Sequence, residues 1–331
     1  MESSRRERGD VRKRIIFFIA LGWVLLLIGD RVDELRLYQG ANLSMYAIGL
    51  ASVVLLTGYS GQVSLGNGAL MAVGAYSAAL SLNNLKFPVW ATFIVAIIAA
   101  AIFGMILGYA AARLSGPYLA GTTLALAVGL PALANQFAIL GGEQGLSFNI
   151  GMPPARLGEE FALYKWFFWI ATFLALISLF ITSNIVDSRF GRTWRAIRGN
   201  ALAAELAGVN AGRSKVLAFS VSAGLAGLAG AVLAMATSLV SPGSFTLSLS
   251  FALVTGAVLA GISSLPGVML GAVILVAIPE IADVVAHRLG DSERVTTHLP
   301  GLIVSVLLIL SVIFTPNGPG ENLRKHRKKH A

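Results

Sequence analysis

Long apolar runs alternate with short polar segments along the whole chain. The runs cover residues 15–28, 43–57, 70–82, 89–112, 122–140, 165–181, 216–237, 251–262, 268–285 and 302–314. Apolar runs that carry almost no charge are typical of transmembrane helices. The pattern therefore predicts an all-α polytopic membrane protein with about ten transmembrane segments.

The basic residues gather in polar segments at residues 1–14, 188–215 and 324–329. Lysine and arginine are enriched on the cytoplasmic side of membrane proteins, and ten spans place all three segments on that side. We therefore expect a basic cytoplasmic tail at 1–14, a transmembrane domain at 15–316 with a cytoplasmic loop at 188–215, and a second basic cytoplasmic tail at 317–331. The first apolar run lacks a small-x-small cleavage site after it, so we interpret it as a span and not as a signal peptide.

Two polar, glycine-containing segments interrupt the apolar pattern, at 57–69 (TGYSGQVSLGNGA) and 241–250 (SPGSFTLSLS). Irregular backbone is tolerated at membrane depth only where protein or a water-filled cavity surrounds it. Each segment follows the first helix of a four-span set, which predicts an inverted repeat with a central pathway. The polar side chains expected to border that pathway, with packing as the alternative for each, are Tyr59, Ser60, Gln62, Ser64, Asn67, Ser244 and Thr246.

The loop at 188–215 carries arginines at three-residue spacing, and Phe190, Trp194 and Ile197 lie on another side of the same predicted helix. Gly199 ends that helix, Asn200 can cap a second short helix, and Gly208 can supply a left-handed stop. The pattern predicts two helices joined by a turn, which form a compact knob on the cytoplasmic surface. The alternative is a basic loop that only fixes the orientation in the membrane.

The composition agrees with a membrane protein: 56% of the 331 residues are hydrophobic and 12% are charged, whereas soluble domains are about 25% charged. The net charge of +9 comes from the tails and the loop, so we do not expect nucleic-acid binding. The chain has no cysteine, and its four histidines are scattered, so we expect no metal site.

Several stretches resemble the permease subunits of bacterial ABC importers for branched-chain amino acids, of the LivM type. They are GYSGQVSLGNGALMAVGAYSAAL (58–80), RLSGPYLAGTTLA (113–125), LGGEQGL (140–146), RAIRGNALAAELAGVNAGRSK (195–215), FSVSAGLAGLAGAVLA (219–234), LAGISSLPGVMLGAV (259–273) and the pair Pro279-Glu280. The pair Glu143-Gln144 departs from relatives that often have small or hydroxylic residues there.

This resemblance implies a type II-like ABC importer permease of the bacterial cytoplasmic (inner) membrane, with both termini in the cytoplasm. Its expected partners are the lipid bilayer, a second homologous permease, two cytoplasmic ATPases and an extracytoplasmic binding protein that delivers branched-chain amino acids; urea or short-chain amides are alternative substrates. The chain has no G-x-x-x-x-G-K-[ST] segment, so it cannot hold ATP in a P-loop; we expect it to bind no cofactor and expect ATP on the partner subunits. The residues expected to couple the permease to the ATPase are Arg195, Arg198, Asn200, Leu202, Ala203, Ala204, Glu205, Leu206 and Gly208.

The main alternative is a secondary transporter or a channel for a small polar solute. Ion coupling usually needs an ionisable group within the membrane, and spans two to eight contain no carboxylate. Glu280 and Asp283 in span nine are the candidates, with solvation at a helix end as the other explanation. A membrane enzyme would need a nucleophile, base or metal cluster, and the sequence contains no cluster of that kind.

Overall fold

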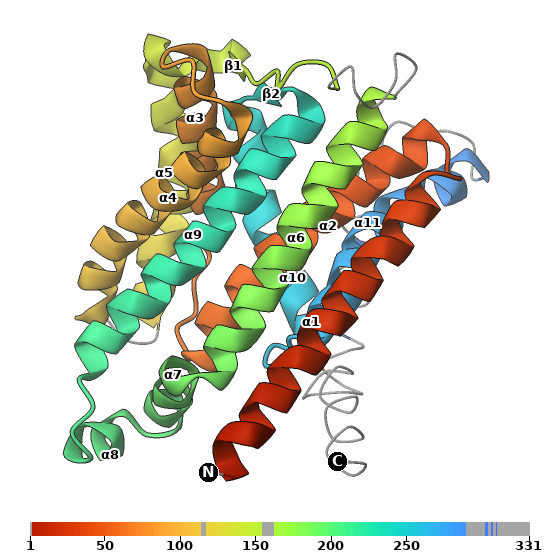
Figure 1. Ribbon diagram of the computed structural model, residues 1–331. Helices are drawn as coiled ribbons and strands as arrows, with labels where there is room; N and C mark the ends of the chain where they lie inside the picture. The colour runs from red at the N-terminus through yellow and green to blue at the C-terminus, as the bar shows by residue number, and fades with distance from the viewer. Residues whose placement is uncertain are drawn as a thin grey trace.

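The computed structural model describes residues 2–113, 117–153 and 162–288, together with helical positions 302, 303, 306 and 309. Its helices lie obliquely side by side in one bundle (Figure 1). In chain order they are α1 (Glu2–Gly29), α2 (Glu34–Val53), α3 (Asn67–Asn83), α4 (Val89–Ala112), α5 (Pro117–Gln136), α6 (Leu163–Asp187), α7 (Arg189–Gly199), α8 (Ala201–Leu206), α9 (Ala211–Thr237), α10 (Leu247–Ala260) and α11 (Gly267–Arg288).

Several shorter elements connect or extend these helices. A π-helical turn, η1 (Val54–Tyr59), continues α2, and 3-10 turns cover Ala138–Leu140, Gly142–Gln144 and Pro242–Phe245. The two-residue strands β1 (Leu146–Ser147) and β2 (Leu239–Val240) pair antiparallel. In Figure 1 this pair lies at the end opposite α7 and α8, and α1 starts at the same end as α7 and α8.

Six helical segments in the described part of the chain are long and apolar enough to cross a membrane: Glu34–Tyr59, Val89–Ala112, Tyr118–Gln136, Leu163–Asp187, Ala211–Thr237 and Pro242–Ala260. Two shorter apolar helices are Phe18–Gly29 and Gly267–Ala282. These findings confirm a mostly helical, polytopic membrane protein. The count of ten spans and the inverted repeat stay predictions, and most of the predicted span at 302–314 lies outside the described residues.

The helix boundaries differ from the predicted ones where helices continue beyond the apolar runs. The second helix begins at Glu34 and not at 43, within a segment expected to lie outside the membrane. Its earlier start is stabilised by packing, because the Tyr38 and Tyr164 rings meet edge to face with centroids 6.1 Å apart. The fifth helix ends at Gln136 and not at 140, since Phe137 has an extended backbone (φ −97°, ψ 111°) and Ala138–Leu140 form a 3-10 turn.

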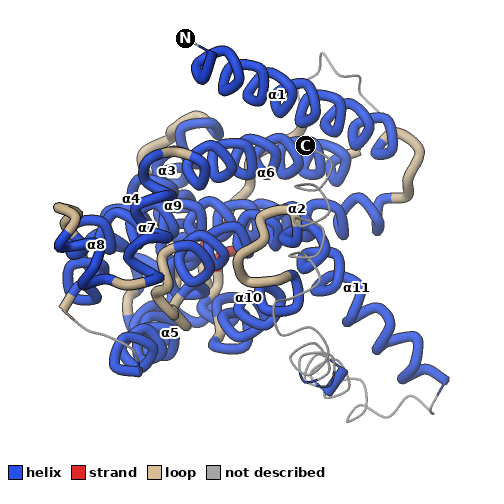
Figure 2. The backbone as a smooth tube through the Cα atoms, turned by 90° about the horizontal axis from the view of Figure 1, so that it is seen from below, coloured by secondary structure: helices blue, strands red, loops and turns tan. Residues whose placement is uncertain are grey.

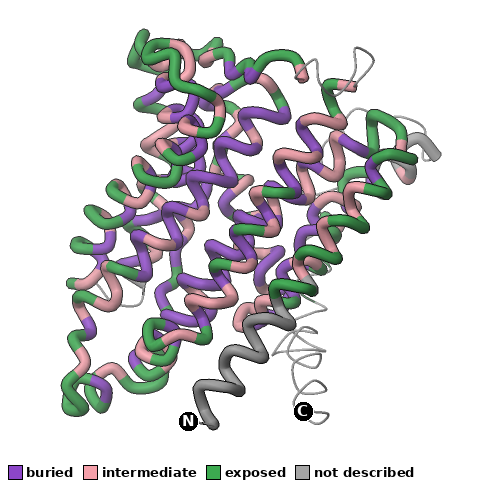
Figure 3. Tube along the Cα trace, in the orientation of Figure 1, coloured by how far each residue is buried: buried purple, intermediate pink, exposed green. Residues whose placement is uncertain are grey.

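Buried positions gather along α9 and α2, which lie in the middle of the bundle (Figure 3). The helix α9 approaches α3 and α4 so closely that glycines are required where the helices touch. A Cβ atom on Gly74 would lie 2.3 Å from the Cα atom of Gly227, and one on Gly104 would lie 2.2 Å from the Cβ atom of Ala223. Small residues between helices are the usual solution in lipid. The helix α1 packs against α6 at the edge of the bundle (Figure 2).

Candidate functional site

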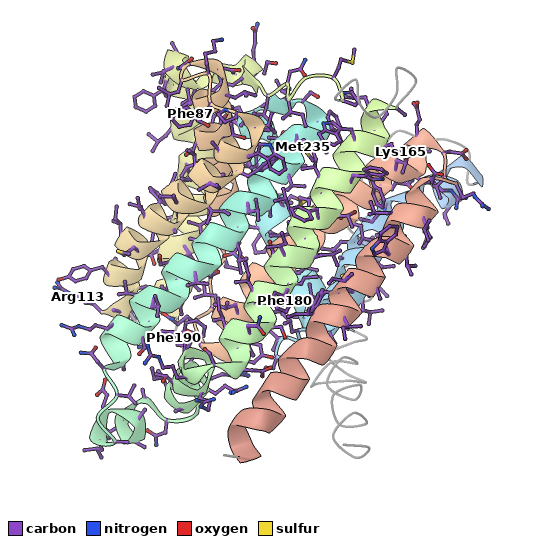
Figure 4. The ribbon with its side chains drawn as sticks, viewed as in Figure 1. Phe87, Arg113, Lys165, Phe180, Phe190 and Met235 are labelled. Atoms are coloured by element: carbon purple, nitrogen blue, oxygen red, sulfur yellow. The ribbon has the colours of Figure 1, made fainter. Side chains whose placement is uncertain are left out.

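The amphipathic helix α7 is fastened to the bundle by its apolar side. Trp194 is 1% exposed, packs among Leu55, Ala218 and other buried residues, and donates through Nε1 to the Ser214 carbonyl at 3.0 Å. Ile197 is buried as well, whereas Phe190, expected on the same face, is 41% exposed. Figure 4 shows Phe190 at the end of the bundle where Arg113 also lies. The predicted amphipathic helix is therefore present, with its apolar side centred on Trp194.

The short helix α8 is capped at both ends, as the sequence predicts. The Asn200 side-chain oxygen accepts from the backbone N–H of Ala203 at 3.0 Å. Gly208 follows the helix with φ +86°, and its N–H donates to the Glu205 carbonyl at 2.9 Å. These caps satisfy backbone groups that a helix this short would otherwise leave to water. A six-residue helix thus holds a defined shape.

The outer surface of α8 is apolar at the centre and turned away from its own bundle. Leu202 is 67% exposed and Leu206 is 84% exposed, with Ala203 and Glu205 exposed between them. Ala204 points the other way and is buried with Ile197 and Ala211. We use the term knob from here on for residues 199–210, which include α8. Its two leucines, Leu202 and Leu206, point away from the described part of the bundle.

Two of the predicted coupling arginines contact their own chain. Nη1 of Arg198 donates to the Gly58 carbonyl, and it also donates to Ser263 Oγ at 2.7 Å. The Arg195 guanidinium lies 5.8 Å from the centre of the Tyr59 ring. Their role toward a partner stays a prediction, but the observed contacts link the knob to the first polar interruption.

The polar side chains of that interruption are buried and hydrogen-bonded, whereas Gly61 and Val63 are exposed. Tyr59, Ser60, Gln62, Ser64 and Asn67 are each at most 5% exposed. The Gln62 amide nitrogen donates to Ser60 Oγ at 2.5 Å, and the Gly66 N–H donates to Ser64 Oγ at 3.3 Å. Protein therefore surrounds the polar side chains of this irregular segment, which is the condition under which such groups are tolerated at membrane depth.

Four helices supply the partners that hold the same segment. The Asn67 amide nitrogen donates to Ser52 Oγ of α2 at 3.1 Å, and the Leu65 N–H donates to Thr123 Oγ1 of α5 at 3.0 Å. The helices α9 and α10 contribute the Lys215 carbonyl and the Ser250 hydroxyl. The side-chain oxygens of Gln62 and Asn67 are buried and have no hydrogen-bond partner among the described residues.

The two predicted interruptions meet inside the bundle. The Gly68 N–H donates to Ser250 Oγ at 3.0 Å, and a Cβ atom on Gly68 would lie 3.5 Å from the Thr246 carbonyl oxygen. Asn67 and Thr246, the candidates nearest this contact, therefore come from segments that touch. Ser244 is half-buried and its hydroxyl lies 3.1 Å from the Ser241 hydroxyl. The part that these side chains play in a pathway stays a prediction.

A second exposed face was not assigned from the sequence. The helix α5 exposes small and polar positions beside the larger Tyr118, Val128 and Leu133, and a Cβ atom on Gly121 or Gly129 would meet no atom within 4 Å. Asn135 and Gln136 are exposed at the end of the same helix. By contrast, α4 exposes large apolar side chains, among them Trp90, Ile94, Ile98, Ile102 and Ile106. Lipid suits the α4 face, whereas polar groups in a span usually face protein or water.

A helical membrane bundle with a capped knob at one end and a buried polar interruption is the architecture of a membrane transport subunit. Residues 36–312 match the family described as branched-chain amino acid transport system / permease component. The chain belongs to this family. The family is one of transport permeases.

Individual relatives agree with the family. The chain is 30% identical to the high-affinity branched-chain amino acid transport system permease protein LivM of Escherichia coli (strain K12), over 94% of this chain and 76% of that protein. It is 29% identical to the permease protein LivH of Salmonella typhimurium (strain LT2), over 86% of this chain and 94% of that protein. The BraD permease of Pseudomonas aeruginosa (strain PAO1) is 26% identical over 83% of this chain and 91% of that protein. No solved structure matches the chain.

Proposed function

We propose that this chain is the membrane-spanning subunit of an ATP-driven importer that moves branched-chain amino acids, or closely related small polar solutes, across the bacterial inner membrane. The observation that carries the proposal is the knob, whose leucines are exposed although its backbone is capped and anchored. Exposed apolar side chains on a rigid polar surface are typical of a protein interface. The partner that docks there is a cytoplasmic ATPase, because this chain has no ATP-binding loop.

The remaining partners follow from the same assignment. The face of α5 that carries Gly121 and Gly129 is suited to a second homologous permease, since small residues let helices approach closely in lipid. Relatives named LivM and LivH both match this chain, which supports a pair of related permeases. An extracytoplasmic binding protein delivers the solute at the end of the bundle opposite the knob, and both termini lie on the cytoplasmic side.

The docking test replaces Leu206 by Asp in the full permease, co-expressed with its ATPases. Loss of a leucine from an interface costs about 2 kcal/mol, a factor of about thirty in association. We therefore expect normal insertion but a strong loss of ATPase co-purification and of solute-stimulated ATP hydrolysis. Gly208→Pro should act in the same direction, because proline cannot adopt the φ of +86° that ends α8.

The matched control is Leu35→Asp, which changes a leucine 68% exposed in the first turn of α2. The preceding helix α1 starts at the knob's end of the bundle and runs to the opposite end, where α2 begins (Figure 1). It should leave ATPase binding unchanged. If both knob variants keep wild-type coupling, the knob is only a topogenic loop and the ATPase docks elsewhere. Transport assays with leucine, isoleucine, valine, urea and acetamide then separate the amino-acid substrate from the amide alternative.

A further inference from the structure

We propose that Arg198 is a positioning residue that joins the knob to both inner loops of the bundle and carries knob movement to them. The inner loops are residues 58–62, after α2, and residues 261–266, between α10 and α11. The inference rests on the proposed function, because the knob is displaced only if an ATPase docks on it. It assigns to one side chain the mechanical connection between that docking and the inner end of the solute route.

The hydrogen bonds of Arg198 reach distant parts of the chain. It is the residue before Gly199, where α7 ends, so its backbone belongs to the knob's base. Its Nη1 donates to the carbonyl of Gly58, 140 residues away in sequence, and to Ser263 Oγ, 65 residues away. Ser263 Oγ also lies 3.4 Å from the same Gly58 oxygen. One guanidinium therefore holds α7 and both inner loops at a single point.

The main chains of the two inner loops are in direct contact beside Arg198. A Cβ atom on Gly58 would lie 1.8 Å from the Ile262 carbonyl oxygen, so the two inner loops touch through their main chains. Gly61 has φ +74°, and a Cβ atom there would lie 2.8 Å from Cγ of Arg198. Because close-packed groups cannot be compressed, a shift of the arginine displaces both loops together.

Arginine fits this position for a geometric reason. Its planar guanidinium carries several N–H donors in a fixed arrangement and stays charged, so it can serve a carbonyl and a hydroxyl at once. If the residue served only to keep the loop on the cytoplasmic side, any positively charged side chain would be sufficient. Arg192 in the same helix carries the same charge but joins no distant segments. Among the described residues, its Nη1 donates to the nearby Asp187 carbonyl at 3.1 Å.

Other interactions keep the knob attached when Arg198 is changed. Trp194 bonds to the Ser214 carbonyl, and Ala204 of α8 is buried with Ile197 and Ala211; neither contact involves Arg198. The leucines of α8 are not involved. Removal of the Arg198 side chain should therefore uncouple movement of the knob from movement of the inner loops. The fold of the knob and its docking surface should stay unchanged.

The experiment compares Arg198→Ala, Arg198→Lys and Arg192→Ala in the complete complex, reconstituted in liposomes with the binding protein. For Arg198→Ala we expect wild-type abundance and ATPase retention, but about tenfold less solute transported per ATP hydrolysed, which corresponds to about 1.4 kcal/mol. Arg198→Lys should restore part of the coupling, and Arg192→Ala, which removes the same charge, should leave it unchanged.

A double-mutant cycle with Ser263→Ala measures whether the effects of the two changes on transport per ATP are additive. A general fall in stability would not produce non-additive effects at these two residues. Ser263→Ala should lower coupling in the same direction, and the two effects should not add fully, because both changes remove the hydrogen bond between Arg198 and Ser263. Equal coupling in Arg198→Ala and Arg192→Ala, or additive effects of the Arg198 and Ser263 changes, would overturn the inference.

Two further outcomes are informative. If Arg198→Ala does not accumulate in the membrane, the same cycle is measured with Arg198→Lys and Ser263→Ala. Arg198→Lys keeps the positive charge, and the effects of the two changes on coupling must again be non-additive. If the wild-type permease retains no ATPase, the proposed function itself fails. A wild-type complex that couples normally, with Arg198 variants that couple equally well, removes only the role of Arg198.

Discussion

Gly230 gives the sharpest test of the packing between α9 and α3. A Cβ atom at this position would lie 1.9 Å from the Met71 carbonyl oxygen and 2.5 Å from the carbonyl carbon. Real Cβ atoms essentially never approach other atoms within 3.0 Å, so Gly230→Ala must separate the two helices by at least 1.1 Å, the difference between 3.0 and 1.9. The opposing atoms belong to the backbone, so no side-chain rotation relieves the clash.

The expected cost of this separation lies at the upper end of the range for overpacked cores, about 3 kcal/mol. It includes the weaker dispersion attraction along α9, which packs on α2, α3 and α4. With the entropy of unfolding typical of domains above 150 residues, 3 kcal/mol corresponds to a fall in Tm of roughly 6 °C. Thermal unfolding of the purified permease in detergent measures this shift.

The matched control is Gly212→Ala in the same helix α9, because a Cβ atom there would meet only Asn210 Oδ1, at an ordinary contact distance of 3.6 Å. Both variants add one methyl group to a membrane helix, and alanine is the better helix former in each case. The control should therefore match or slightly exceed wild-type stability. Equal Tm values for the two variants would refute the argument that close backbone approach between α3 and α9 requires glycine.

Three further predictions concern orientation, the buried polar segment and an outer ion pair. In the cysteine-free chain, Leu206→Cys should be protected from an impermeant thiol reagent in intact cells and Leu35→Cys should be labelled, whereas labelling at 206 would reverse the orientation. Asn67→Leu breaks a buried hydrogen bond, so stability should fall by about 1 to 3 kcal/mol; uptake per inserted molecule falls as well only if the side chain borders the route. The Lys165 ammonium bonded to Asp30 holds the pKa of that carboxyl below its usual range, so the Tm difference between wild type and Asp30→Asn should be present at neutral pH and vanish as pH falls through the lowered pKa.

The helices of this protein could be predicted from hydrophobicity because the bilayer imposes long apolar runs. The predicted span at 89–112 coincides with α4, which follows Pro88 and ends before Arg113. Errors arise where a helix extends past its apolar run. The helix α9 begins at Ala211 and not at Val216, because Asn210 caps it and its first turns carry Arg213 and Lys215 outside the apolar stretch.

The knob could also be predicted, since helix caps are local signals. Asn200 and Gly208 perform the roles that their residue types favour, and both lie close to α8 in the sequence. The hydrogen bonds of Arg198 could not be predicted, because its partners Gly58 and Ser263 belong to distant segments. An arginine that fixes topology and an arginine that joins two loops have the same local sequence pattern.

The two polar interruptions show how local and long-range information combine. Their glycines and hydroxyl groups indicate irregular backbone at membrane depth, and burial of that backbone requires hydrogen-bond partners from the rest of the protein. The structure supplies one such partner from the other interruption, since the Gly68 N–H donates to Ser250 Oγ. The N–H belongs to the first turn of α3 and the hydroxyl to the first turn of α10, where backbone donors of a helix have no intrahelical acceptor. Pairing the starts of two helices thus satisfies a donor that lipid could not, and a bond of this kind between distant segments cannot be predicted from local sequence.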